Sequence, residues 1–415
     1  MIPRPVRTSN VPVGLMVEIP VPAIGFAYLV LAFVLSCYVR TPGPERYTFY
    51  AVPLVLWAAH LFETRGVLGV RPLKGALLIC LATVIPTLLN VSGGAKYAVF
   101  SLTGILVAFV PVYLTRRQVS FLGFVCFGLQ LLVWGETGFS LNFGAELTRY
   151  TTLAATDILP FVSILFVGFF LLDRQFAKAA MMIAVVPLGD KRIADFALFV
   201  AMPYLALSLY TGAAVLRGAA SNKARGFVSS LPFRHWSTWY VLPLMITAAV
   251  VAISFVWIMT QISYAYGLNV NVFSSGRVVG QRLAVAHLIA RPWWEALFGG
   301  GLSLADALAA PAWFQQGILL HNDYLRLALN YGILGALAVV CGYWRLFSST
   351  NFGRYVLAIN AILWISDNTF IYAVYQVFSV LLLQSSMRFG RAYRPAPKSV
   401  HHMQRKRMQP VKMSV

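Results

Sequence analysis

The chain has 415 residues, of which 59% are hydrophobic and only 11% are charged. A soluble protein of this length cannot bury so large an apolar fraction, so the composition excludes an ordinary soluble domain. The net charge of +20 does not indicate nucleic-acid binding, because the basic residues gather in a C-terminal tail and in loops between apolar segments.

Apolar segments of membrane-spanning length recur along the whole chain, most of them with about 17–22 residues. They predict an all-α polytopic membrane protein with about twelve transmembrane helices. The expected segments are 21–39, 47–62, 75–91, 97–114, 119–135, 153–172, 176–188, 194–210, 241–260, 324–343, 354–366 and 369–387. We expect a single transmembrane domain over 1–387, with no cleavable signal peptide, followed by a basic cytoplasmic tail over 388–415.

The loop charges predict the orientation of these segments. Twelve spans place both termini on one side, and the basic loops share that side with the basic tail. Lysine and arginine favour the cytoplasmic side of short loops, so we expect both termini in the cytoplasm. The basic residues in question are Arg65, Arg71, Lys74, Arg116, Arg117, Arg174, Lys178, Arg345, Arg354 and those of 217–234. Lys191 and Arg192 are the exception, because they would lie outside.

This orientation leaves two longer segments outside, at about 136–150 and about 261–322. The second is the longest polar stretch, and we expect it to form a large loop on the outer side of the membrane, between the ninth and tenth helices. Within it, Gly276 favours a helix start and Pro292 a helix stop, and the GGGLS sequence at 299–303 indicates a break.

Several arginines of these outer segments could bind an anion. Arg277 follows Ser-Ser-Gly at a helix start, where backbone N–H groups favour an anion and a guanidinium can grip phosphate with two hydrogen bonds. Arg282 and Arg291 lie further along the same helix. The alternative for each is contact with lipid headgroups at the membrane surface.

A second charged pair lies near the sixth segment. Arg149 stands at its outer end, and Asp157 follows eight residues later, about two helical turns into the membrane. An ionisable group at that depth is paired or functional. The alternative to a functional role is a structural contact between Asp157 and Arg149.

His321 stands directly before the tenth apolar segment, at the end of the longest loop, with Asp323 two residues later. An imidazole can take up a proton near neutral pH. A lone histidine is more often structural than catalytic, but this position at the membrane boundary favours a catalytic role. Beside the arginines, it indicates chemistry on a substrate that is part lipid and part anion.

The motifs for nucleotide and metal chemistry are missing from the sequence. It contains no DxD pair, no Walker or dinucleotide glycine motif, and no His/Cys cluster with metal-ligand spacing. Cys37, Cys80, Cys126 and Cys341 fall in or beside apolar segments and are expected to be packing residues. We therefore expect a metal-free reaction without a cofactor, on a substrate with an activated leaving group such as a lipid diphosphate.

Two motifs resemble those of a known superfamily, the bacterial O-antigen ligases and Wzy-type polysaccharide polymerases. The first is SGR at 275–277, followed by a helix, Pro292 and FGGGLS at 298–303. The second is HNDYLRLALNYGILG at 321–335. The segment around Arg149 is similar to a third pattern, but this chain has Thr156-Asp157 where the family commonly has Pro-Asn.

The resemblance implies a GT-C type fold in the bacterial inner membrane and an inverting glycan transfer from undecaprenyl diphosphate to an acceptor hydroxyl on the periplasmic face. His321 would be the base, and Arg277 and Arg149 would hold the diphosphate. Arg282, Asp157 and Asp323 would support them. The implied partners are the undecaprenyl-diphosphate-linked glycan, an acceptor glycan or lipid A–core, the bilayer and a regulator of chain length, with no nucleic acid.

Three functions remain open at this point. A polymerase passes the chain to another lipid-linked repeat unit, whereas a ligase passes it to lipid A–core or to a protein. The histidine motif followed by SDNTFIY at 366–372 resembles the polymerase branch, so a polymerase is preferred. A transporter or lipid-glycan flippase is the third function. It predicts polar residues near mid-membrane and inverted repeats, whereas the charges of this chain lie at segment ends and in one outer loop, and no repeat is seen.

Overall fold

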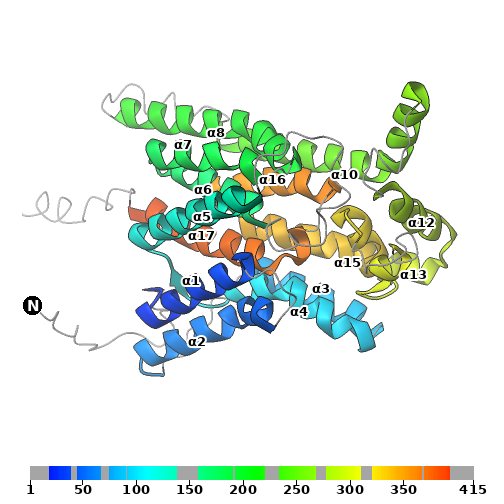
Figure 1. Cartoon of the computed structure of the whole chain (residues 1–415), viewed down its shortest axis with the longest axis horizontal. Coiled ribbons are helices and arrows are strands. Elements are labelled where there is room, and N and C mark those ends of the chain that lie inside the picture. Colours follow the sequence, from blue (N-terminus) through cyan, green and yellow to red (C-terminus); the bar gives the residue numbers. More distant parts are fainter. Residues whose placement is uncertain are drawn as a thin grey trace, which may run out of the picture.

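The computed structural model describes residues 18–38, 44–66, 74–89, 91–137, 158–189, 192–219, 233–267, 277–309, 320–366 and 369–392. Figure 1 shows most of its long helices side by side in one bundle, with α12 and α13 at one end. The strands of the described part are β1 (Ile19–Pro20) and β2 (Val112–Tyr113), which pair in parallel. The described chain is therefore mostly helical, as predicted.

Each predicted segment overlaps one helix of the bundle. These helices are α1 (Ala23–Tyr38), α2 (Val52–Glu63), α3 (Lys74–Leu89), α4 (Val91–Val107), α5 (Arg116–Thr137), α6 (Leu159–Leu172), α7 (Phe176–Val185), α8 (Arg192–Ala219), α10 (Phe233–Tyr266), α15 (Asp323–Phe347), α16 (Asn351–Ser366) and α17 (Ala373–Ala392). Three stretches of the described chain, in α5, α8 and α15, are long and apolar enough to cross a membrane: Arg116–Gly135, Ile193–Tyr210 and Asp323–Phe347. Shorter apolar helices accompany them.

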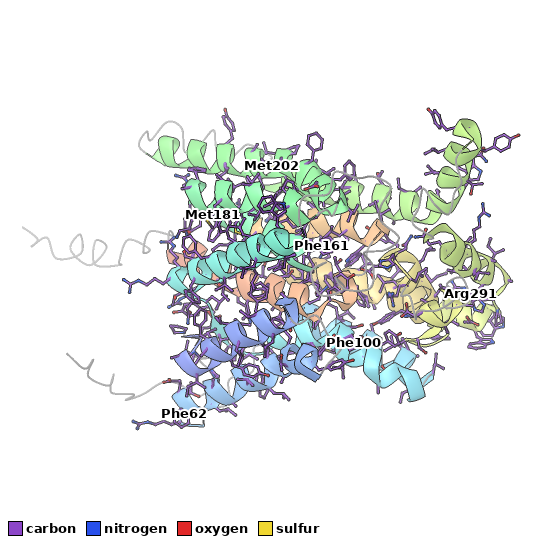
Figure 2. All side chains as sticks on the ribbon, in the orientation of Figure 1. Phe62, Phe100, Phe161, Met181, Met202 and Arg291 are labelled. Atoms are coloured by element: carbon purple, nitrogen blue, oxygen red, sulfur yellow. The ribbon has the colours of Figure 1, made fainter. Side chains whose placement is uncertain are left out.

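The most deeply buried helices are α6, α16 and α17. Every residue of α6 from Leu159 to Phe170 is buried, and Figure 2 shows Phe161 of this helix inside the bundle. Small residues let the helices approach closely: a Cβ atom added to Gly75 of α3 would lie 2.4 Å from the carbonyl oxygen of Gly342 in α15. Such close approach stabilises helix packing where no water is present.

The outer helices carry exposed apolar side chains instead. Examples from α3, α5, α8 and α10 are Leu77, Leu81, Phe121, Phe199 and Ile246. So much exposed apolar surface is unfavourable in water and suits contact with lipid. The coarse prediction of an all-α membrane protein is therefore compatible with both the core and the surface of the bundle.

One end of the bundle, here called the basic end, carries Arg116, Arg117, Arg174, Lys178 and Arg388. It lies at the left of Figure 1, where α17 ends. Three contacts bring helix ends together there. The pairing of β1 with β2 joins the starts of α1 and α5, and the backbone N–H of Leu114, just before α5, donates a hydrogen bond to Ser385 Oγ of α17 at 2.9 Å. Arg116 of α5 pairs at 2.8 Å with Asp173, which lies between the end of α6 and the start of α7. The start of α1 and the end of α17 thus share one end.

The sequence explains why α5 starts at the basic end. The Thr115 side chain accepts a hydrogen bond from the Gln118 backbone N–H at 3.2 Å, and the Gln118 side chain accepts one from the Thr115 N–H at 2.9 Å. This reciprocal capping satisfies two backbone donors at a helix start. Helix α17 continues past residue 388 to Ala392, and Arg388 lies over the ring of Tyr113 at 5.5 Å.

The opposite end, here called the cap end, consists of α12 (Arg277–Ala290), α13 (Trp293–Phe298), α14 (Leu304–Ala309) and the start of α15. Figure 2 shows Arg291 there. Helix α12 begins after Gly276 and ends before Pro292, which confirms that prediction. The described part of the expected loop is largely helical and has a small apolar core, made of Ala284, Ala305, Leu320, Leu325 and Leu329.

A glycine turn fastens the cap to α15. Gly332 interrupts α15 with φ 64° and ψ −175°, and a Cβ atom at this position would lie 2.4 Å from the backbone nitrogen of Gly299. Gly299 itself has φ 85°, and Gly300 donates a hydrogen bond to the carbonyl oxygen of Leu329 at 2.9 Å. Only glycine adopts the Gly332 conformation without strain.

Gly332→Ala should therefore lower the free energy of unfolding by at least about 2 kcal/mol. Titration with sodium dodecyl sulfate in mixed micelles, followed by circular dichroism, measures this change. The matched control is Gly128→Ala in α5, where an added Cβ atom meets no atom within 4 Å and the variant should be at least as stable as the parent. Equal unfolding curves for the two variants would contradict the strain at Gly332.

Candidate functional site

His321 lies at the cap end, directly before α15. The next residue, Asn322, caps the helix, because its Oδ1 atom accepts a hydrogen bond from the Leu325 N–H at 3.0 Å. The backbone carbonyl of His321 accepts a hydrogen bond from Gln281 Nε2 at 3.1 Å. The backbone is thus held from two sides, while the side chain is half-buried and reaches the surface.

Helix α12 is joined to His321 through Gln281. This side chain is fully buried, and its Oε1 atom has no hydrogen-bond partner in the described part of the chain. Arg277 is the first residue of α12 and stands four residues before Gln281, which puts the two positions on the same face of the helix. Position 277 therefore shares a helix face with the residue that contacts the His321 backbone.

The other arginines of α12 make different contacts. Arg282 is exposed and donates a hydrogen bond to Thr260 Oγ1 in α10 at 2.8 Å. Arg291, at the end of α12, donates to the carbonyl oxygen of Ala328 in α15 at 2.7 Å. Burial lowers the pKa of Arg291, and the nearby Glu295 carboxylate partly offsets that effect. The described contact of Arg282 is with α10, and that of Arg291 is with the first half of α15.

A buried ion pair contacts the backbone of Leu320, the residue directly before His321. Arg326 of α15 is only 1% exposed and binds the Asp306 carboxylate of α14 with two hydrogen bonds of 2.5 and 2.9 Å. The guanidinium also donates to the carbonyl oxygen of Leu320 at 2.9 Å and lies 3.5 Å from Asp323 Oδ1. Sequence reasoning missed Arg326 and Asp306, although a charge inside an apolar segment three residues after Asp323 signals a paired group.

The two carboxylates connect separate segments to the start of α15. Asp306 Oδ1 accepts a hydrogen bond from the Leu320 N–H at 2.8 Å, next to His321 in sequence. Asp323 is fully buried, and its Oδ2 atom accepts one from the Phe370 N–H at 2.8 Å, in the 3-10 turn η6 (Thr369–Ile371) before α17. These contacts of Asp323 hold the start of α15 against the turn before α17.

Another histidine of the cap end is engaged differently. His287 of α12 lies 2.5 Å from the Glu295 carboxylate of α13, measured between Nε2 and Oε1. That contact joins two cap helices.

Within the described residues, no group of three His, Cys, Asp or Glu side chains could hold a metal ion. Arg149 and Asp157 lie outside the described residues, so their predicted places beside His321 stay predictions.

The cap end thus combines a half-buried imidazole, a helix start at Arg277 and a buried ionic network that holds the backbone on both sides of His321. An imidazole in such a place can accept a proton from a hydroxyl group, and a helix start favours a bound anion. Comparison of the chain with models of protein families, with curated proteins and with solved structures gives no match. The residues themselves are therefore the basis for any functional conclusion.

Proposed function

We propose that this chain is a glycosyltransferase of the bacterial inner membrane. It transfers a glycan from undecaprenyl diphosphate to an acceptor sugar hydroxyl on the periplasmic face, as an O-antigen or exopolysaccharide polymerase. The single observation that carries the proposal is the hydrogen bond from Gln281 to His321, which joins the histidine to the helix that begins at Arg277. The resemblance of 275–335 to the ligase and polymerase superfamily supports it.

In the proposed reaction, His321 takes the proton of the acceptor hydroxyl while the hydroxyl oxygen attacks the anomeric carbon. The attack occurs on the face opposite the diphosphate. The bond between the anomeric carbon and the diphosphate oxygen breaks as the new bond forms, so the anomeric centre inverts. Undecaprenyl diphosphate leaves with the electron pair. Arg277 and Arg149 stabilise its developing negative charge, with Arg282 in support, so the step needs no metal ion.

The proposed topology has twelve membrane-spanning helices of GT-C type, both termini in the cytoplasm and the cap end in the periplasm. The basic end supports it, because cytoplasmic loops collect lysine and arginine. Arg116, Arg117, Arg174 and Lys178 lie at that end, as does Arg388 in the last turns of α17. The remaining basic pair of the sequence, Lys191 and Arg192, stays an exception to the rule.

A polymerase and a ligase differ in the acceptor alone. Incubation of the purified protein with undecaprenyl-diphosphate-linked repeat units as the only substrate distinguishes them. A polymerase lengthens the glycan chain under these conditions, and we expect a ladder of products on gel electrophoresis. No lengthening without lipid A–core, and transfer once lipid A–core is added, would establish the ligase in place of the polymerase.

Arg277→Gln should lower the transfer rate by about 10²–10³-fold, the usual loss when one group that stabilises developing negative charge is removed. Initial rates at saturating acceptor, over a range of lipid-linked donor concentrations, measure the effect. Arg345→Gln serves as a control, because Arg345 is an exposed arginine in the last turn of α15, away from the cap end. An Arg277 variant as active as this control would show that Arg277 does not stabilise the departing diphosphate.

A further inference from the structure

A groove of about 610 Å³ opens at the basic end, between the first turns of α5 and α7. Its charged lining consists of Arg116, Arg117, Lys178 and Asp173. Three cations against one carboxylate leave the groove with a net positive charge. Since the groove lies at the end opposite His321, it is separate from the proposed transfer site.

The three cations are held in different ways. Arg116 pairs with Asp173 at 2.8 Å, and Lys178 Nζ donates to Ser120 Oγ at 2.6 Å and to a neighbouring glutamine. The Arg117 side chain is exposed and makes no hydrogen bond or ion pair within the described part of the chain. The one carboxylate therefore neutralises Arg116, and the charges of Arg117 and Lys178 are left for an external anion.

The start of α7 adds to this positive potential. Its N-cap residue, Gln175, makes no side-chain hydrogen bond to the first backbone N–H groups of the helix. Those N–H groups carry the partial positive charge of the helix start. Gln175 itself lines the groove, so the helix start and the cations act on the same volume.

Aromatic rings continue the groove toward the middle of the bundle. Phe121 and Phe124 line it one and two turns after Arg117, on the same face of α5. Their side chains are 50% and 51% exposed. Because α5 is long and apolar enough to cross a membrane, this face passes from a cation at the helix start to apolar rings at the depth of acyl chains.

We propose that this groove binds an anionic phospholipid of the surrounding bilayer. Arg117 and Lys178 contact its phosphate, and Phe121 and Phe124 pack against an acyl chain. Charge complementarity selects an anionic headgroup over a zwitterionic one. The continuous surface of cations and exposed rings selects a lipid over a soluble anion, which would leave the rings uncovered.

Native mass spectrometry of the delipidated full-length protein tests this proposal. The protein is titrated with phosphatidylglycerol or with phosphatidylcholine, and the first bound lipid is quantified. The parent protein should prefer phosphatidylglycerol. Arg117→Gln should weaken phosphatidylglycerol binding about fivefold and leave phosphatidylcholine binding unchanged. Phe121→Ala should weaken the binding of both lipids.

Arg65→Gln is the matched control, because Arg65 is an exposed arginine at the end of α2 and does not line the groove. Its affinity for phosphatidylglycerol should equal that of the parent. Equal losses in the Arg65 and Arg117 variants, or equal affinity of the parent for both lipids, would overturn the site. Displacement of phosphatidylglycerol by inorganic phosphate at equal concentration would show a site for soluble anions instead. Circular dichroism confirms that each variant is folded.

Discussion

Glycan transfer by the purified protein should fall by about 10²–10⁴-fold when His321 is replaced by glutamine, the usual contribution of a general base. Glutamine approximates the size and hydrogen-bonding capacity of histidine but cannot accept the proton. The fold should survive the change, because the contact from Gln281 reaches the backbone carbonyl of residue 321 and not its side chain. Initial rates of product formation in detergent or in proteoliposomes measure the loss.

His287→Gln provides the matched control for this prediction. It makes the same chemical change at the same end of the bundle, and glutamine can keep a hydrogen bond to Glu295, which His287 contacts at 2.5 Å. The control should retain the parent rate within a few-fold. A His321 variant that turns over as fast as the His287 variant would exclude His321 as the base, whatever the reaction.

The buried ion pair should give the largest effect on stability. Asp306→Asn removes the charge that Arg326 binds with two hydrogen bonds, inside a part of the bundle where Arg326 is 1% exposed. Removal of one partner of a buried pair costs about 3–5 kcal/mol, and the Asp323 carboxylate, 3.5 Å from Arg326, compensates the remaining charge only in part. The free energy of unfolding in mixed micelles measures the loss.

Two comparisons identify the cause of that loss. Asp173→Asn breaks an ion pair whose arginine side chain is 48% exposed, and it should cost about 1 kcal/mol or less. The triple change of Asp306 and Arg326 to leucine and of Asp323 to asparagine should be less destabilising than Asp306→Asn alone, since no buried charge then remains in this cluster. A triple variant that is less stable than the single one would contradict this explanation.

Hydropathy predicted the helices of the bundle well, because each depends on its own apolar run. Helix α12 was also predictable, since Gly276 and Pro292 are local signals that act within the segment they bound. Helix ends were predicted less well: α10 continues to Tyr266 and α17 to Ala392. Aromatic and charged residues such as Tyr266 and Arg388 lower the hydropathy of a segment without breaking the helix, so hydropathy places its end too early.

The candidate site was predictable only in part. His321 and Arg277 stand out because each is an ionisable group at a segment boundary. Gln281 has no such signal, since a neutral amide in a helix gains its role from the carbonyl it happens to face. The pairing of Asp306 with Arg326 joins α14 to α15 across twenty residues, and no local pattern encodes that approach.

The release of undecaprenyl diphosphate tests the central claim most directly. Proteoliposomes that contain the purified protein and an undecaprenyl-diphosphate-linked glycan are supplied with an acceptor glycan, and both lipid products and glycan products are followed by mass spectrometry. We predict release of undecaprenyl diphosphate in step with glycan transfer, and no release with the His321→Gln variant. Movement of the intact lipid-linked glycan across the bilayer, without release of the diphosphate, would contradict the enzyme and establish a transporter.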